Sequence, residues 1–196
     1  MTSTDVVRDR ILSHGLGIAS AEGLHALSMG DVARDLDLSR SGLFAHFATK
    51  ESLQLGVLEQ AANMFIRDVL RAADGAAPGE ARLKALFTNW IAWARSPRLK
   101  GGCPFVHASA ESDALPEPVR GKLKNVLDAW SVSLKTAIDE AITAEQFKPD
   151  LDADQLVFEL TGLYLSHHFW HWSMKDRTAL TRTKKAFERV LEASKA

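Results

Sequence analysis

The stretch LSRSGLFAHFATKESL, Leu38–Leu53, contains two helix starts close together. Ser39 and Thr49 each precede a charged residue. Ser and Thr are preferred N-cap residues because their hydroxyl oxygen accepts a hydrogen bond from an unpaired backbone N–H at the start of a helix. Between these caps the sequence predicts a helix over 40–47, which is too short to be stable alone. This helix must therefore be held in place by its neighbours.

The two faces of this short helix differ in chemistry. Leu43, Phe44 and Phe47 are spaced three and four residues apart, so we expect them to form one apolar face that anchors the helix. The outer face carries one charged side chain and three small or polar ones: Arg40, Ser41, Ala45 and His46. A short, capped and anchored helix with a small polar outer face suits insertion into a groove of DNA.

The composition is that of a globular protein. The chain has 196 residues, of which 46% are hydrophobic and 25% charged, and its net charge of −1 does not itself predict a nucleic-acid partner. No apolar run approaches the roughly 18 residues of a membrane span, and the opening MTSTDVVRDR does not resemble a signal peptide. The single cysteine, Cys103, excludes an internal disulfide and a multi-cysteine zinc site. We expect a cytoplasmic protein with no membrane partner, in which Cys103 is a small buried residue rather than an oxidant sensor.

Apolar residues recur at helical spacing along nearly the whole chain, and no strand-type alternation is present. The sequence predicts an all-α protein of about nine helices, over residues 4–22, 28–36, 40–47, 49–73, 81–95, 105–112, 118–143, 153–174 and 176–194. Gly23 is the expected stop of the first helix. Ser28 with Asp31 resembles a variant capping box, and a helix, a short turn and a second helix form a helix-turn-helix. We expect a DNA-binding domain over 1–50 and a larger helical domain over 51–196.

These motifs together resemble the TetR family of transcriptional regulators. The family has a Ser or Thr that opens the second helix, a short recognition helix that ends in aromatic-x-His-Phe, and then Ser/Thr-Lys-Glu-x-Leu. The matching residues here are Ser28, the run from Ser39 to Phe47 with Phe44, His46 and Phe47, and then Thr49, Lys50, Glu51 and Leu53. The remaining chain matches in helix number and length, and the GGCPF segment matches some subgroups.

The resemblance implies a homodimer with one DNA-binding domain in each subunit. The third helix of each domain would lie in the major groove, the C-terminal helices would form a ligand cavity, and the last two helices would pair with their counterparts in a four-helix bundle. Phe44 stands where the family often has Tyr. Because Phe44 has no hydroxyl, only its anchoring role is expected here.

The DNA-binding module is acidic, with five Lys and Arg residues against eight Asp and Glu residues over 1–60. Affinity must therefore come from a few placed groups rather than from a broad basic surface. We expect Ser28, His46, Thr49 and Lys50 to contact phosphates, and Arg40, Ser41 and Ala45 to contact base edges. The predicted DNA-binding set is Ser28, Ser39, Arg40, Ser41, Ala45, His46, Thr49 and Lys50. The alternatives are that the hydroxyls act as helix caps alone, that Arg40 is a solvated charge and that Lys50 pairs with Glu51.

Aromatic residues concentrate in the C-terminal region, where four helices with bulky stripes can enclose an apolar cavity. We expect a hydrophobic or aromatic ligand, with Trp90, Trp93, Phe105 and Trp130 as its lining. The alternative is that these side chains form an ordinary core. Trp93 does not follow the main stripe of its helix, so exposure or contact with a neighbouring helix is the alternative there.

The run SHHFWHWS, Ser166–Ser173, places His167 and His171 four residues apart on one helix face. This spacing is compatible with a metal pair, but no third ligand is evident, and we favour packing across a dimer interface. The predicted dimer-interface residues are Tyr164, His167, His168, His171, Trp172, Phe187, Val190 and Leu191.

The sequence thus predicts a ligand-responsive transcriptional regulator, most simply a repressor. It would bind a palindromic operator as a homodimer and be released by a small hydrophobic or aromatic effector. We expect no catalytic residues, no metal and no cofactor. The alternatives are a helical metal-binding enzyme that uses His167 and His171, and a helical interaction adaptor that does not bind DNA.

Overall fold

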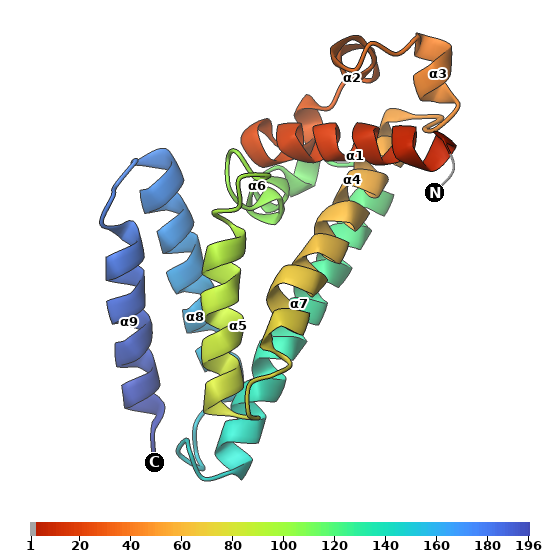
Figure 1. The fold of residues 1–196 in the computed structure, drawn as a ribbon. Coiled ribbons are helices and arrows are strands. Elements are labelled where there is room, and N and C mark those ends of the chain that lie inside the picture. Colours follow the sequence, from red (N-terminus) through yellow and green to blue (C-terminus); the bar gives the residue numbers. More distant parts are fainter. Residues whose placement is uncertain (1–2) are drawn as a thin grey trace. The chain divides into compact units, whose positions relative to one another are not determined.

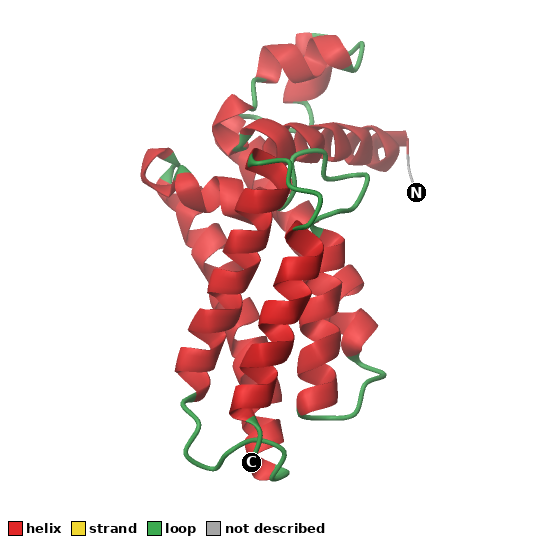
Figure 2. Ribbon diagram, turned by 90° about the vertical axis from the view of Figure 1, so that its left-hand side faces the viewer, coloured by secondary structure: helices red, strands yellow, loops and turns green. Residues whose placement is uncertain are grey.

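The structure is a computed structural model that describes residues 3–196, and these form nine α-helices (Figure 1). The α-helices are α1 (Ser3–Glu22), α2 (Met29–Asp35), α3 (Arg40–Phe44), α4 (Lys50–Phe65), α5 (Glu80–Trp93), α6 (Pro104–Ala110), α7 (Glu117–Thr143), α8 (Ala153–His168) and α9 (Ala179–Ser194). Short helical turns are η1 (Leu24–Ala26), η2 (Ile66–Leu70), η3 (Arg71–Ala73), η4 (Ser112–Ala114) and η5 (Phe169–Ser173). Figure 2 shows only helices and loops over the described range, which confirms the all-α prediction.

The chain folds into two compact units. The first unit comprises the chain up to Met64 together with Arg95–Val126, and the second comprises Phe65–Ala94 together with Leu127–Ala196. The functional division at residue 50 stays a prediction. None of the described helices combines the length and the apolar character that crossing a membrane requires.

In the first unit, α2 and α3 form the helix-turn-helix next to α1 (Figure 1). Ser28, Ser39 and Thr49 each accept a hydrogen bond from the backbone amide three residues further on, at 3.3, 3.0 and 3.0 Å. All three predicted N-caps are therefore confirmed. The turn between α2 and α3 passes through Asp37 with a positive φ of 55°, a conformation that Asp tolerates better than most residues.

The prediction that Phe44 anchors α3 is wrong. Leu43 and Phe47 are buried, but 48% of Phe44 is exposed. The α-helix ends at Phe44, and a hydrogen bond from the Phe47 amide to the Leu43 carbonyl, 3.0 Å long, adds a last helical turn. So short a helix buries only a narrow stripe of side chains, and Leu43 and Phe47, four residues apart, fill this stripe.

The glycines in the break before α6 allow the backbone to approach α1 closely. A Cβ atom on Gly101 would lie 2.1 Å from the Ser20 carbonyl oxygen, so only glycine fits there. The Ser20 hydroxyl donates to the Gly102 carbonyl at 2.7 Å and accepts from the Gly101 amide at 3.1 Å. These bonds fix the segment that leads into α6 against the end of α1.

Two of the long predicted helices stop being α-helical earlier than expected. α4 ends at Phe65 and α8 at His168, and each continues as a π-helical turn, η2 and η5. The buried residues Phe65, Val69 and Ala73 are spaced by four, slightly more than one α-turn. A wider turn keeps such a row on one side, which explains why the helical periodicity alone did not reveal the change.

Candidate nucleic-acid interface and C-terminal aromatic cluster

The outer face of α3 is open to solvent. Four of its residues are exposed, namely Arg40, Ser41, Phe44 and Ala45. His46 is half-buried. Arg40 makes no hydrogen bond or ion pair with any residue in the described range 3–196. The structure therefore brings three of the predicted base-contacting residues onto one accessible face, and it adds Phe44, which the sequence had assigned to the core.

Lys50 begins α4 beside this face. Its Nζ donates to the His25 carbonyl of η1 at 2.6 Å, which uses one of three ammonium donors and leaves the others for an anion. The His46 carbonyl accepts a bond from Arg8 Nη1 at 3.3 Å, and the Arg8 guanidinium lies 4.4 Å from the centre of the Phe47 ring. Arg8 thus supports the end of α3 from α1.

On α2, the positive charge of Arg34 is neutralised by neighbouring acids. Arg34 lies 2.7 Å from Asp31 and 3.3 Å from Asp35, and the charge of Asp31 is the main cause that raises the pKa of Arg34. A hydrogen bond with the Ser28 side chain, followed by the charge of Arg34, lowers the pKa of Asp31. This ion-pair cluster leaves little net positive charge beside α3, in agreement with the acidic count of the module.

Glu111, just after α6, and α4 both bond to η1. The Glu111 carboxylate accepts the Leu24 amide at 2.5 Å and the His25 amide at 3.3 Å, and it also contacts His25 Nδ1. Gln54 of α4 donates to the Leu24 carbonyl at 2.9 Å. No motif in the sequence marks this contact, because Glu111 lies far from η1 in the chain.

The second unit contains a packed aromatic cluster. Trp90 stacks on Tyr164 with ring centres 3.8 Å apart, and it meets Trp130 edge to face at 4.9 Å. Phe65 contacts both Trp130, at 4.9 Å, and Trp93, at 5.0 Å. Three predicted ligand-lining residues, Trp90, Trp93 and Trp130, are therefore buried together, and Trp93 faces a neighbouring helix rather than solvent.

Two features of the predicted lining were not evident from the sequence. The fourth residue, Phe105, lies on α6 in the first unit, where it is buried. Trp130 is 6% exposed, and its indole Nε1 has no hydrogen-bond partner among residues 3–196. Leaving a buried N–H without a partner costs about 1–3 kcal/mol, so a ligand atom that accepts a hydrogen bond from this donor would bind more tightly.

The predicted dimer-interface residues divide by burial. Tyr164, His167, His168, Phe187 and Leu191 are buried within the second unit, whereas His171, Trp172 and Val190 are half-buried. Exposed apolar side chains lie on another side of the same helical segment. These are Phe158, Leu165 and Phe169, which are 73%, 47% and 51% exposed and spaced by seven and four residues.

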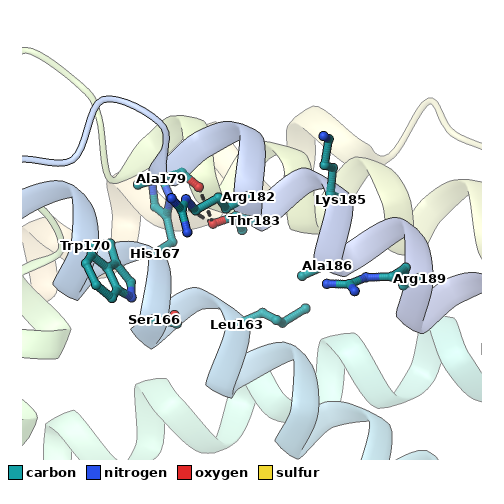
Figure 3. A pocket seen from close by; sticks show the side chains of 10 residues that line it. All are labelled: Leu163, Ser166, His167, Trp170, Ala179, Arg182, Thr183, Lys185, Ala186 and Arg189. Atoms are coloured by element: carbon teal, nitrogen blue, oxygen red, sulfur yellow. Dashed lines mark hydrogen bonds between the residues drawn. The ribbon is translucent and has the colours of Figure 1, made fainter.

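A surface groove of about 320 Å³ runs between α8 and α9 (Figure 3). Arg182, Lys185 and Arg189 of α9 contribute its cationic side chains, and Trp170 and Leu163 belong to the opposite wall. A second groove of about 520 Å³ continues along the same pair of helices and shares Leu163, Ala186 and Arg189 with the first. The cationic lining suits a carboxylate or another anion.

His167 and His171 stack with ring centres 5.4 Å apart. The Thr183 hydroxyl donates its hydrogen to the Ala179 carbonyl. Because that hydrogen is used, the Thr183 oxygen accepts from His167 Nδ1, which lies 3.2 Å away. Within residues 3–196, no group of three or more His, Cys, Asp or Glu side chains is arranged to hold a metal ion.

Comparison with known structures shows the fold. The chain is 21% identical to a TetR transcriptional regulator from Chloroflexus aurantiacus, with a TM-score of 0.86 over 98% of this chain and 96% of the other. A transcriptional regulator from Saccharomonospora viridis in complex with choline gives 18% identity and a TM-score of 0.79, over 96% of both chains. AibR in complex with isovaleryl coenzyme A and operator DNA gives 19% identity and 0.73, over 93% and 95%.

Family models match both parts of the sequence. The model described as "Bacterial regulatory proteins, tetR family" matches residues 11–56, which include α2, α3 and the start of α4. The model described as "Tetracyclin repressor-like, C-terminal domain" matches residues 79–187, more than half of the chain. No curated protein matches the sequence. The two family models together show that this chain belongs to the TetR family of bacterial transcriptional regulators.

Proposed function

We propose that this protein is a repressor that binds a palindromic operator as a homodimer and is released by a small effector. The observation that carries the proposal is the exposed outer face of α3. Arg40 on this face makes no ion pair with any described residue, and the capped start of α4 follows α3 in the chain. A short helix held by its neighbours, with accessible polar side chains, is the form in which helix-turn-helix proteins enter the major groove. AibR, which has the same fold, was solved with operator DNA and an acyl coenzyme A.

The proposed roles at the DNA follow the chemistry of each side chain. Arg40 would contact guanine, with Ser41 and Ala45 beside it. Ser28, Ser39, His46, Thr49 and Lys50 would contact or approach phosphates while the three hydroxyls also cap helices. Since the module is acidic, binding would depend on few phosphate contacts and would show a shallow salt dependence.

The proposed dimer uses α8 and α9 of each subunit. The exposed residues Phe158, Leu165 and Phe169 support this interface because they form an apolar row on the outside of α8 and η5. His171, Trp172 and Val190 would border this interface. The buried residues of the predicted set would pack beneath it, namely Tyr164, His167, His168, Phe187 and Leu191. A two-fold axis would then present two copies of α3 to two half-sites of DNA.

The proposed effector is a hydrophobic or aromatic molecule with a hydrogen-bond acceptor. Trp90, Trp93 and Trp130 would contact its apolar part, and Phe105 stays a further predicted contact. The buried Nε1 of Trp130 supports the acceptor, because a ligand oxygen there would satisfy a donor that no described residue satisfies. The ligand would act by favouring the dimer whose recognition helices are wrongly spaced for DNA.

The test is a gel shift with purified protein on the DNA upstream of its own gene. We expect a specific complex at low salt that candidate effectors dissociate, and Arg40→Ala should reduce the preference for that DNA over unrelated DNA. A folded, dimeric protein that binds no specific DNA would refute the proposal and favour the helical adaptor.

The interface is tested separately by sedimentation of Leu165→Glu. A buried unpaired charge in the interface should make the protein monomeric, whereas Val6→Glu on α1, at a position that is similarly exposed, should leave it dimeric. A dimeric Leu165→Glu variant would place the interface elsewhere.

A further inference from the structure

The accessible arc of α3 contains a side chain that cannot form hydrogen bonds. Successive residues of an α-helix are rotated by about 100°. With Arg40 as the origin, Phe44 lies at about 40°, Ser41 at about 100° and Ala45 at about 140°. All four side chains reach solvent. By these angles Phe44 lies between Arg40 and Ser41, two of the predicted base-contacting residues, and not at an edge of the arc.

An exposed ring alone is common on protein surfaces. Phe44 differs because the buried stripe of α3 is complete without it, since Leu43 and Phe47 already fill the contact with the rest of the unit. Its ring is thus not required to anchor the helix. If the arc faces the major groove, a side chain that lies between Arg40 and Ser41 meets base edges as they do.

The chemistry of the major groove leaves one partner for such a ring. Guanine, cytosine and adenine present hydrogen-bond donors and acceptors there, whereas thymine also presents its C5-methyl group. A phenyl ring offers no hydrogen bond and gains only by burying an apolar group. A residue with a hydroxyl at this position could bond a phosphate, but Phe44 cannot.

We propose that Phe44 is a specificity-determining residue that reads a thymine through contact between its ring and the C5-methyl group. Arg40 and Phe44 are one helical turn apart, about 6 Å along the axis, and base pairs are spaced about 3.4 Å apart. The thymine therefore lies within about two base pairs of the base that Arg40 contacts. This inference rests on the proposed operator binding.

The experiment begins by selecting an operator from random DNA with the wild-type protein. Each thymine in one half-site is then replaced by deoxyuridine, which pairs identically but lacks the methyl group. We expect one position at which the dissociation constant rises about fourfold, the value for removing one buried methyl group, and about sixteenfold when both half-sites carry the change. Phe44→Ala should bind the thymine and uracil DNAs equally, and Phe44→Leu should keep part of the difference.

Arg40→Ala is the matched control on the same helix, because it should lower affinity while the response to uracil stays. Wild-type protein that binds its operator equally well with every thymine replaced would overturn the inference but leave operator binding intact. The inference also fails if Phe44→Ala weakens binding yet keeps the full response to uracil. A selection that enriches no sequence would instead refute the proposed function and the inference with it.

Discussion

On α3, the candidate residues Arg40, Ser41 and Phe44 extend into solvent, whereas Trp90 and Trp130 of the aromatic cluster lie in contact with other rings. These three α3 side chains contribute little to the packing of the first unit, because α3 is held by the buried Leu43 and by the Ser39 cap. In the second unit the same side chains are candidates for both ligand binding and the core. The difference predicts that DNA binding can be removed without loss of stability, while ligand binding cannot.

Trp90→Ala is the substitution with the largest expected effect on folding. Removing a buried ring that stacks on Tyr164 should lower the free energy of unfolding by about 3–5 kcal/mol, measured by chemical denaturation. Val132→Ala, at an exposed position of the same unit, should change it by no more than about 0.5 kcal/mol. A small effect of Trp90→Ala would contradict this difference between the two units and indicate that the ring borders an open cavity.

Arg40→Ala should produce the opposite pattern. We expect the binding free energy for the operator to weaken by about 1–3 kcal/mol per half-site, because a bidentate contact to guanine is lost. The free energy of unfolding should stay within about 0.5 kcal/mol, since Arg40 is exposed and free of internal partners in the described range. Titration of operator and unrelated DNA in parallel checks this, and equal losses on both would assign Arg40 to a phosphate.

The helix starts within the first 56 residues followed from local rules. Ser28, Ser39 and Thr49 are hydroxyl residues directly before charged or apolar helical segments, and the stereochemistry of capping is local, so sequence suffices. The exposure of Phe44 could not be predicted in the same way. On so short a helix, spacings of three and four both fit an apolar face, and only the packed partner decides which residue faces it.

Non-local contacts account for the rest. Glu111 and η1 meet through a bond between a carboxylate and backbone amides, and no sequence pattern marks amides as partners. The spacing of four in Phe65, Val69 and Ala73 could have signalled the π-helical turn, but one turn is too short to separate it from an α-helix. For α8, apolar side chains on several faces left open which ones are buried in the unit and which remain for a partner.

Thr49→Ala should have an intermediate effect that connects fold and function. The Thr49 hydroxyl accepts the Ser52 amide, and the Ser52 hydroxyl in turn accepts the Thr49 amide at 3.1 Å. Loss of this cap should cost about 1 kcal/mol of stability, and Thr49→Ser should restore it because the oxygen is kept. If Thr49 also contacts a phosphate, Thr49→Ala weakens binding to all DNA sequences alike and Thr49→Ser does not. Wild-type thermal stability in Thr49→Ala would show that Ser52 alone sustains the start of α4.

The ion pair between Lys135 of α7 and Asp154 of α8 should contribute least. Its charged atoms are 3.5 Å apart and both side chains reach water, so the coupling in a double-mutant cycle should be below about 1 kcal/mol and vanish in high salt. Asp139→Asn, which removes the other acid near Lys135 at 3.6 Å, is the control. Phe158 lies one turn from Asp154, on the row proposed for the dimer. A coupling of about 2 kcal/mol or more would therefore mean that the pair is shielded from water in solution, as a second copy docked on α8 would do.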